Sequence, residues 1–196
     1  MEKALMPGVL SMQAFNDLKL HRGFIVRVGI FLLILSVILM LLSALLMPKE
    51  FMNSGYPSTS NILGFYELPE DSLDVLFLGS SHAITAFDTQ KLYDDEGIRS
   101  YVLGSGEQNV AVSWFYLNEA LKTQKPDAVV MDTLMAFPFR ESKVLYSSAP
   151  STEKALNFMK PGFNKFRAVF ELSQYDEELS ALEMLLPFLR YHERWN

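Results

Sequence analysis

Apolar residues are grouped differently in the two parts of the chain. Near the N-terminus, Val28–Met47 is a run of twenty residues without a charge, made mostly of Leu, Ile, Val, Phe and Met. A helix of that length, at about 1.5 Å per residue, crosses a hydrocarbon core of about 30 Å. Beyond residue 70 the apolar runs are short and alternate with polar turns. The pattern predicts a transmembrane helix followed by a folded domain.

A buried core helix and a cleaved signal peptide are the alternative interpretations of this run. The rest of the chain is too short to surround the run on every side, which disfavours a core helix. Signal peptides have shorter apolar regions and a small-x-small cleavage site, whereas this run ends in Leu45-Leu46-Met47-Pro48. An uncleaved signal anchor is therefore the favoured interpretation.

The charges beside the run predict its orientation. Lys19, Arg22 and Arg27 precede it, whereas only Lys49, offset by Glu50, follows it closely. Positively charged flanks stay in the cytoplasm, so we expect a single-pass protein of the cell membrane with a cytoplasmic N-terminus. The expected parts are a cytoplasmic lead, the anchor, a linker with an entry segment, and an extracytoplasmic domain: 1–27, 28–47, 48–70 and 71–196.

The pattern after residue 70 predicts an α/β domain. Short buried strands alternate with helices, and the crossovers between them are long enough for a doubly wound parallel sheet with Val75–Leu78 in its centre. The expected elements, in chain order, are the strand Val75–Leu78, the helix Phe87–Glu96 ending at Gly97, the strand Ser100–Leu103, the helix Val110–Thr123 and the strand Ala128–Met131.

Beyond the third strand the pattern predicts helices. The segment 137–150 is irregular, and Ser151 or Thr152 is expected to cap a helix that runs to Met159. Two further helices are expected at Phe163–Leu172 and Asp176–Leu189, with Pro187 bending or ending the last one.

Charge and composition exclude several classes of function. Residues 51–196 carry twelve Lys or Arg and twenty Asp or Glu, a net charge of −8, which argues against a nucleic-acid partner. The chain has no cysteine, so disulfides and thiolate metal sites are excluded. An exported domain without disulfides suits a bacterial envelope, and we expect no metal or organic cofactor.

Candidate chemistry lies directly after the first strand, at Gly79-Ser80-Ser81-His82. Ligands of open α/β sheets bind at the carboxyl ends of the strands. A serine there becomes a nucleophile when a base takes its proton and backbone N–H groups receive the oxyanion. The simpler interpretation is a tight turn with a helix N-cap.

The run Asp74–His82, followed by Gly97-Ile98 and Tyr101–Gly104, resembles the SGNH/GDSL hydrolase superfamily. It is most similar to the membrane-anchored branch of bacterial envelopes, which includes teichoic-acid D-alanyl transfer and alginate acetylation proteins. The resemblance covers about residues 64–135. It implies a flavodoxin-like, three-layer α/β domain of which this chain carries the N-terminal part.

The resemblance also implies roles for individual residues. Ser81 matches the nucleophile, Ser80 replaces the aspartate of the Gly-Asp-Ser pattern, and Gly104-Ser105-Gly106 matches the second block. The implied oxyanion hole consists of the backbone N–H groups of Ser81 and Gly106. Proximity to this loop makes three further side chains candidates, Asn109 as an oxyanion donor and His82 and Gln108 as substrate contacts.

Two parts of the family pattern are missing. The third block, Gly-x-Asn-Asp, is replaced by Met131-Asp132-Thr133, and the Asp-x-x-His that supplies the base does not occur. The three histidines are His21, His82 and His192. We expect either that the chain is part of a longer protein or that it is inactive as a hydrolase.

Two functions remain open at this point. The resemblance implies acyl transfer to, or hydrolysis from, a cell-surface glycopolymer through an acyl-Ser81 ester. A multi-pass membrane acyltransferase is then an expected partner. A simple membrane-held esterase is a variant of this hypothesis. The alternative is a non-catalytic membrane-anchored binding or assembly protein that keeps the fold, which the missing histidine favours.

Overall fold

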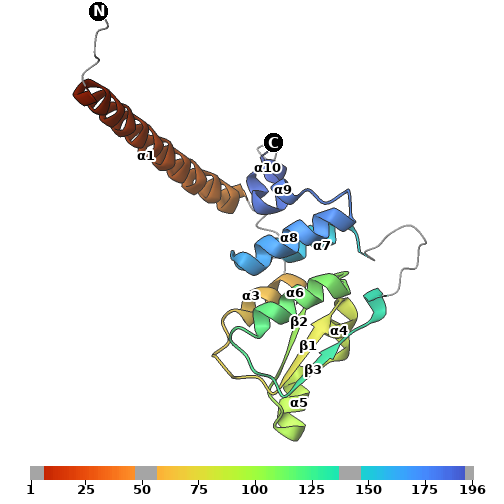
Figure 1. Ribbon diagram of the computed structural model, residues 1–196. Coiled ribbons are helices and arrows are strands. Elements are labelled where there is room, and N and C mark those ends of the chain that lie inside the picture. The colour runs from red at the N-terminus through yellow and green to blue at the C-terminus, as the bar shows by residue number, and fades with distance from the viewer. Residues whose placement is uncertain (1–6, 47–56, 137–146, 193–196) are drawn as a thin grey trace, which may run out of the picture.

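The computed structural model describes residues 7–46, 57–136 and 147–192. One long helix, α1 (Pro7–Leu46), extends away from an α/β domain, as Figure 1 shows. Within α1, Gly23–Leu46 is long and apolar enough to cross a membrane, by length and composition. Only 6% of its most apolar window is buried, so the rest of the described chain does not enclose it as a core helix. This segment starts five residues before the predicted span, and Met47 lies outside the described residues.

The domain contains a three-stranded, fully parallel sheet in the order β2-β1-β3. Its strands are β1 (Val75–Gly79), β2 (Ser100–Gly104) and β3 (Ala128–Met131). The register pairs Val75 with Ser100 on one side and with Ala128 on the other. The predicted α/β class, the parallel direction and the central position of β1 are confirmed.

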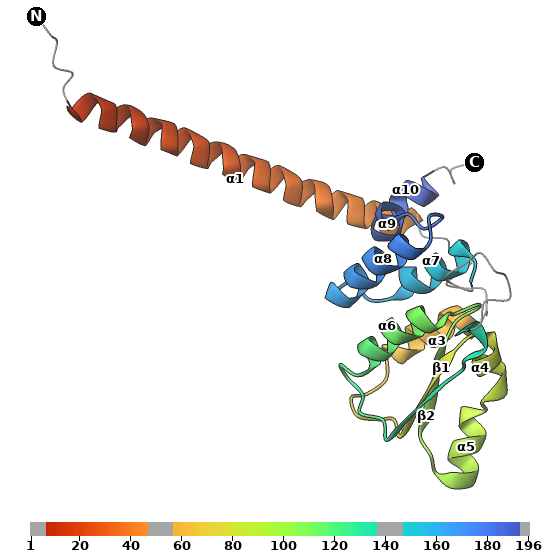
Figure 2. The ribbon, with the colours of Figure 1, turned by 45° about the vertical axis from the view of Figure 1, so that its right-hand side comes forward.

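Helices cover both faces of the central strand (Figures 1 and 2). Leu76 and Leu78 belong to the main core, and Phe77 belongs to a smaller cluster on the other face, where it stacks on Phe87 with ring centroids 3.9 Å apart. The helices of the main core side are α3 (Pro57–Phe65), α6 (Val110–Ala120), α7 (Ala149–Phe158) and α8 (Phe163–Tyr175). Those near the other face are α4 (Ser81–Ala86) and α5 (Thr89–Glu96).

The prediction that the third strand is buried is wrong. Val129 is 41% exposed and Val130 is 39% exposed. These two side chains point to opposite faces of the sheet, because successive residues of a strand alternate. The strand is apolar, but it lies at an edge of the sheet, and the covering helices are centred on β1 and β2.

The helices around the first crossover differ from the prediction. The expected helix Phe87–Glu96 is replaced by two helices, because α4 begins directly after β1 and Phe87 is extended where it stacks on Phe77. Asp88 then caps α5 by accepting the Lys91 N–H at 3.0 Å. Gly97 ends α5 with φ +71°, as expected for a glycine C-cap.

Three later predictions also need correction. The expected linker and entry segment, 48–70, contains the helix α3, and Ser148, rather than Ser151 or Thr152, precedes α7. The expected helix Asp176–Leu189 is split into α9 (Ala181–Leu185) and α10 (Pro187–Tyr191), because Pro187 favours the first turn of a new helix. The irregular segment was predicted for 137–150, of which residues 137–146 lie outside the described residues.

Helix α10 attaches the domain to the end of α1. The Phe188 N–H donates to Ser43 Oγ at 3.2 Å, and Ser43 is only 8% exposed. Leu39, Leu42 and Leu46 are partly buried on the same face. This spacing of three or four residues is one side of a helix, so α10 covers one stripe of the last two turns of α1.

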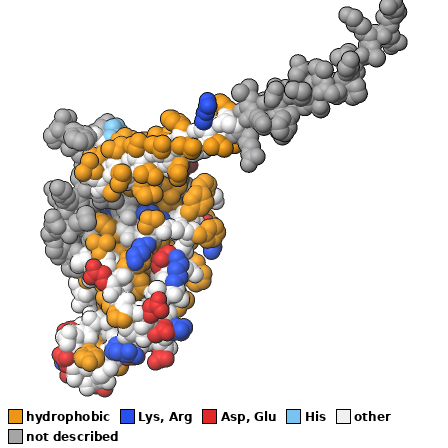
Figure 3. Space-filling view, turned by 90° about the vertical axis from the view of Figure 1, so that its left-hand side faces the viewer, with side chains coloured by type: hydrophobic (Ala, Val, Ile, Leu, Met, Phe, Trp, Pro, Cys, Tyr) orange, Lys and Arg blue, Asp and Glu red, His pale blue; other side chains and the backbone are white. Residues whose placement is uncertain are grey.

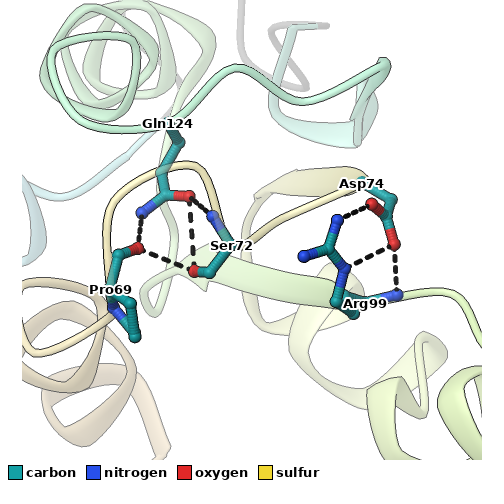
Figure 4. A network of polar contacts seen from close by, with 5 residues as sticks. All are labelled: Pro69, Ser72, Asp74, Arg99 and Gln124. Atoms are coloured by element: carbon teal, nitrogen blue, oxygen red, sulfur yellow. Dashed lines mark hydrogen bonds and ion pairs between the residues drawn. The ribbon is translucent and has the colours of Figure 1, made fainter.

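The N-terminal end of the sheet is fixed by two polar networks, drawn in Figure 4. Gln124, which is 1% exposed, donates from Nε2 to the Pro69 carbonyl at 2.7 Å and accepts the Ser72 N–H at 2.9 Å. The Asp74 carboxylate accepts the N–H and the Nε–H of Arg99, at 2.9 and 3.0 Å, and these bonds lower the pKa of Asp74. Both networks hold the entry to β1 beside later parts of the chain.

We predict that Gln124→Met destabilises the domain by roughly 1–3 kcal/mol, because the Ser72 N–H and the Pro69 carbonyl, in part-buried hydrogen bonds, lose their partner while the side-chain volume is kept. The measurement is thermal unfolding of the full chain in detergent, followed by circular dichroism. Gln174→Met is the control, since Gln174 is exposed on α8. Equal melting of the two variants would contradict this role of Gln124.

Candidate functional site

The carboxyl ends of the three strands meet at two glycines. Gly79 pairs with Gly104, and the Asp132 N–H that follows β3 donates to the Leu78 carbonyl at 2.8 Å. A Cβ on Gly104 would lie 2.7 Å from the Gly79 carbonyl oxygen, and a Cβ on Gly79, whose φ is +153°, would overlap that of Asp132. Only glycine permits this approach, which brings the residues after all three strands together.

A polar network joins the ends of β1 and β3. The Ser80 hydroxyl donates to Asp132 Oδ2 at 2.7 Å, and the Ser80 N–H lies 3.4 Å from the same oxygen. Ser80 is also the N-cap of α4, where its Oγ accepts the His82 N–H at 3.3 Å. The ring Nδ1 of His82 lies 3.3 Å from that Oγ. Ser80 therefore connects Asp132 to His82 while being only 1% exposed.

The charge of Asp132 determines the direction of these hydrogen bonds. Burial alone raises the pKa of Asp132, but the Leu134 N–H, the Ser80 hydroxyl and N–H and the nearby His82 together lower it. An ionised carboxylate only accepts, so the single hydroxyl proton of Ser80 points at Asp132. A hydrogen bond between Ser80 Oγ and His82 then requires the proton on Nδ1.

Ser81, the predicted nucleophile, is the exposed first residue of α4. Its backbone carbonyl accepts the Thr85 hydroxyl at 3.0 Å. Within the described residues, no hydrogen bond joins Ser81 Oγ to the His82 ring, which contacts Ser80 instead. The structure therefore presents an accessible serine beside a buried and fully bonded one.

The amide of Gln108 is used inside the loop that follows β2. Nε2 donates to the Leu103 carbonyl at 3.3 Å and to Ser113 Oγ at 3.0 Å, and Oε1 accepts the Ser105 hydroxyl at 3.0 Å. Gln108 is 3% exposed. In this conformation its side chain holds the loop together, and the predicted substrate contact is untested.

Asn109 and Gly106 lie in the same loop. Asn109 Oδ1 caps α6 by accepting the Val112 N–H at 2.8 Å, and Nδ2 donates to Ser147 Oγ at 2.8 Å. Gly106 has open space where a Cβ would be. The Asn109 amide therefore already has partners on both of its ends, whereas the Gly106 backbone stands in an open part of the loop.

A groove of 530 Å³ begins at Asn109 and continues between α6 and α8. Its lining is mostly apolar and includes Trp114, Phe115, Met135, Leu172 and Tyr175. Sequence analysis did not single out these residues, because they come from three separate segments. An apolar acyl group is the kind of ligand that such a lining accepts.

Asp132 directly follows the third parallel strand, so the sequence makes it a candidate either for contact with the site or for capping a loop. In the structure its carboxylate does both, since Oδ2 accepts the Ser80 hydroxyl and Oδ1 accepts the Leu134 N–H. His192 lies at the end of α10, where its Nδ1 is 2.5 Å from the Leu189 carbonyl oxygen. The described residues contain no group of three His, Asp or Glu side chains able to hold a metal ion.

Comparison of the chain with protein-family models, with curated proteins and with solved structures finds no match. The resemblance to the SGNH/GDSL superfamily therefore stays a prediction, carried by the motif residues.

We predict that Gly79→Ala prevents folding or destabilises the domain by about 3 kcal/mol or more, because it adds an overlap with Asp132 to a strained φ. Gly106→Ala is the matched control, since a methyl group there meets open space. Circular dichroism and thermal melting of both variants in detergent are the measurements. Native stability of Gly79→Ala would show that the strand ends can separate.

Proposed function

We propose that the chain is a membrane-anchored serine acyltransferase or esterase that forms an acyl ester on Ser81 and acts on a cell-surface glycopolymer. The observation that supports this most is the position of Ser81. Ser81 is exposed and begins α4 at the edge where the three parallel strands end, beside the Asp132–Ser80–His82 network. An accessible serine at this edge matches the site of ligand binding in open α/β sheets.

The proposed reaction is a double displacement. Ser81 Oγ attacks the acyl carbonyl carbon and gives its proton to a base, and the negative charge develops on the carbonyl oxygen. Backbone N–H groups at the start of α4 and at Gly106 are the proposed donors to that oxygen. The intermediate collapses to the Ser81 ester as the leaving group departs with a proton. A hydroxyl of the polymer, or water, then attacks the ester and regenerates the serine.

The base of this mechanism is not one of the residues that the family motif supplies. The sequence lacks the family's Asp-x-x-His, and the ring of His82 is held by Ser80 rather than Ser81. The same contact favours a second candidate, a non-catalytic binding or assembly protein. In that case the network and the loop amides serve only to fix the strand ends.

The proposed location is the outer side of a cell membrane, with α1 as the anchor. A multi-pass membrane acyltransferase that delivers the acyl group is the proposed partner. The proposed location rests on the apolar segment Gly23–Leu46 and on the basic residues near its start, whereas the proposed partner rests on the family resemblance alone.

Orientation has a direct test. A reporter enzyme that is active only outside the cytoplasm should work when fused after residue 60 and fail when fused after residue 20. The physical reason is the excess of Lys and Arg before the span. Activity only at the earlier fusion would reverse the topology and remove the envelope role.

Ser81 has a chemical test. We predict slow covalent labelling of Ser81 by a fluorophosphonate, located by peptide mass spectrometry, together with little hydrolysis of p-nitrophenyl acetate. Loss of the base costs a serine enzyme on the order of 10⁶-fold in rate, while oxyanion stabilisation leaves ~10³–10⁴-fold over water. Ser81→Ala should abolish the labelling, and the control Ser173→Ala on α8 should not change it.

Two results would contradict parts of this proposal. Labelling that survives Ser81→Ala, or no labelling of a folded chain, would exclude Ser81 as the nucleophile and favour the binding protein. Rapid ester hydrolysis that is lost in Ser81→Ala would show that this chain does supply a base.

A further inference from the structure

Helix α8 and the turn before it have two chemically different ends. Residues 160–170 contain Lys160, Lys165, Arg167 and three phenylalanines, without an acidic residue. Residues 171–178 contain four acidic residues and no basic one. The apolar and basic end therefore differs from the rest of an extracytoplasmic part that is acidic in total.

The three phenylalanines form an exposed stripe. Phe163, Phe166 and Phe170 follow one another at spacings of three and four residues, which places them on one side of α8. They are 81%, 49% and 48% exposed. The opposite side of the helix is occupied by the core residues Ala168, Val169 and Leu172. A contiguous exposed apolar patch of this kind is typical of a surface that meets a protein partner or a membrane.

The contact between α10 and α1 places this part of the domain near the membrane. Ser43, which binds the Phe188 N–H, lies inside the apolar segment Gly23–Leu46. Helices α8 and α9 pack against each other, and Leu182 of α9 is 60% exposed. If the last turns of α1 are in a bilayer, the helices attached to them lie at its surface.

The arrangement in space agrees with this position. In both Figure 1 and Figure 2, the N-terminal end of α8 points toward the side from which α1 reaches the domain, and its acidic end points away. Figure 3 shows hydrophobic side chains gathered over the end of α1 and the surface next to it. Charged side chains in the same view gather farther from α1.

We propose that the Phe163–Phe166–Phe170 stripe of α8 inserts into the lipid bilayer that α1 crosses, with the exposed Lys160 beside it contacting lipid phosphates. This proposal rests on the membrane anchoring proposed above for α1. Aromatic rings with basic neighbours are the combination that interfacial helices use. Lys165 and Arg167 are not included, because both have partners within the domain. Lys165 Nζ donates to the Asn157 carbonyl at 3.2 Å, and Arg167 Nε pairs with Glu171 Oε1 at 2.5 Å.

The absence of cysteine from the chain permits a clean test. Single cysteines are introduced as Phe163→Cys, Phe166→Cys and Phe170→Cys in the full chain, spin-labelled and reconstituted into phosphatidylglycerol–phosphatidylcholine vesicles. Collision rates with oxygen, which partitions into lipid, are compared with those for a water-soluble nickel chelate. Tyr93→Cys on α5 is the aqueous control, since Tyr93 is 55% exposed. Leu35→Cys reports on α1 itself.

We expect the oxygen-to-nickel ratio at the three α8 positions to be several-fold higher than at Tyr93→Cys, and highest at Leu35→Cys. Ratios at the α8 positions equal to that of Tyr93→Cys would overturn the proposal, and would leave a protein as the covering partner. A lipid-exposed Leu35→Cys in that experiment would keep the anchor intact. A water-exposed Leu35→Cys would instead remove the anchoring proposal on which this one rests. Far-ultraviolet circular dichroism shows that each variant is folded.

Discussion

The close approach of three strand ends at Gly79 is the constraint on which the rest of the domain depends. Because the backbone oxygen of Gly79 lies against Gly104 and its α-carbon lies against Asp132, no side chain fits at either glycine, and the turn into α4 starts directly at this contact. This turn makes Ser80 the cap of α4 and buries its hydroxyl, while Ser81 is left at the surface. The difference in exposure between Ser80 and Ser81 is thus a result of packing at Gly79.

The sequence predicted the sheet well because its signals are local. Short apolar runs, a glycine C-cap and alternating helices are visible without tertiary information, and they indicated the strands and the central place of β1. The exposure of Val129 and Val130 was not predictable in the same way. Apolar composition shows that a strand tolerates burial, but only the arrangement of the covering helices decides whether it is buried.

The candidate site was predictable only in part, for a related reason. The motif placed Ser80, Ser81 and His82 at one turn, but their contacts depend on Asp132, fifty residues farther along the chain. The Ser80 hydroxyl has a single proton, which it donates in a hydrogen bond to the Asp132 carboxylate. A motif does not show which of two neighbouring serines has such a partner. The same limitation applies to the phenylalanines of α8, which helical spacing groups together without showing which side faces the core.

The contact of α10 with Ser43 means that the domain meets its anchor twice, through the chain that continues after Leu46 and through a separate helix near the end of the described residues. A domain joined to a helix at one point can rotate about that point, whereas a second contact restricts this rotation. The α10 contact therefore restricts the position and orientation of the strand edge with Ser81 relative to the end of α1. In the proposed acyl transfer, the polymer acceptor would therefore have to reach that edge, because the second contact limits how the domain turns on α1.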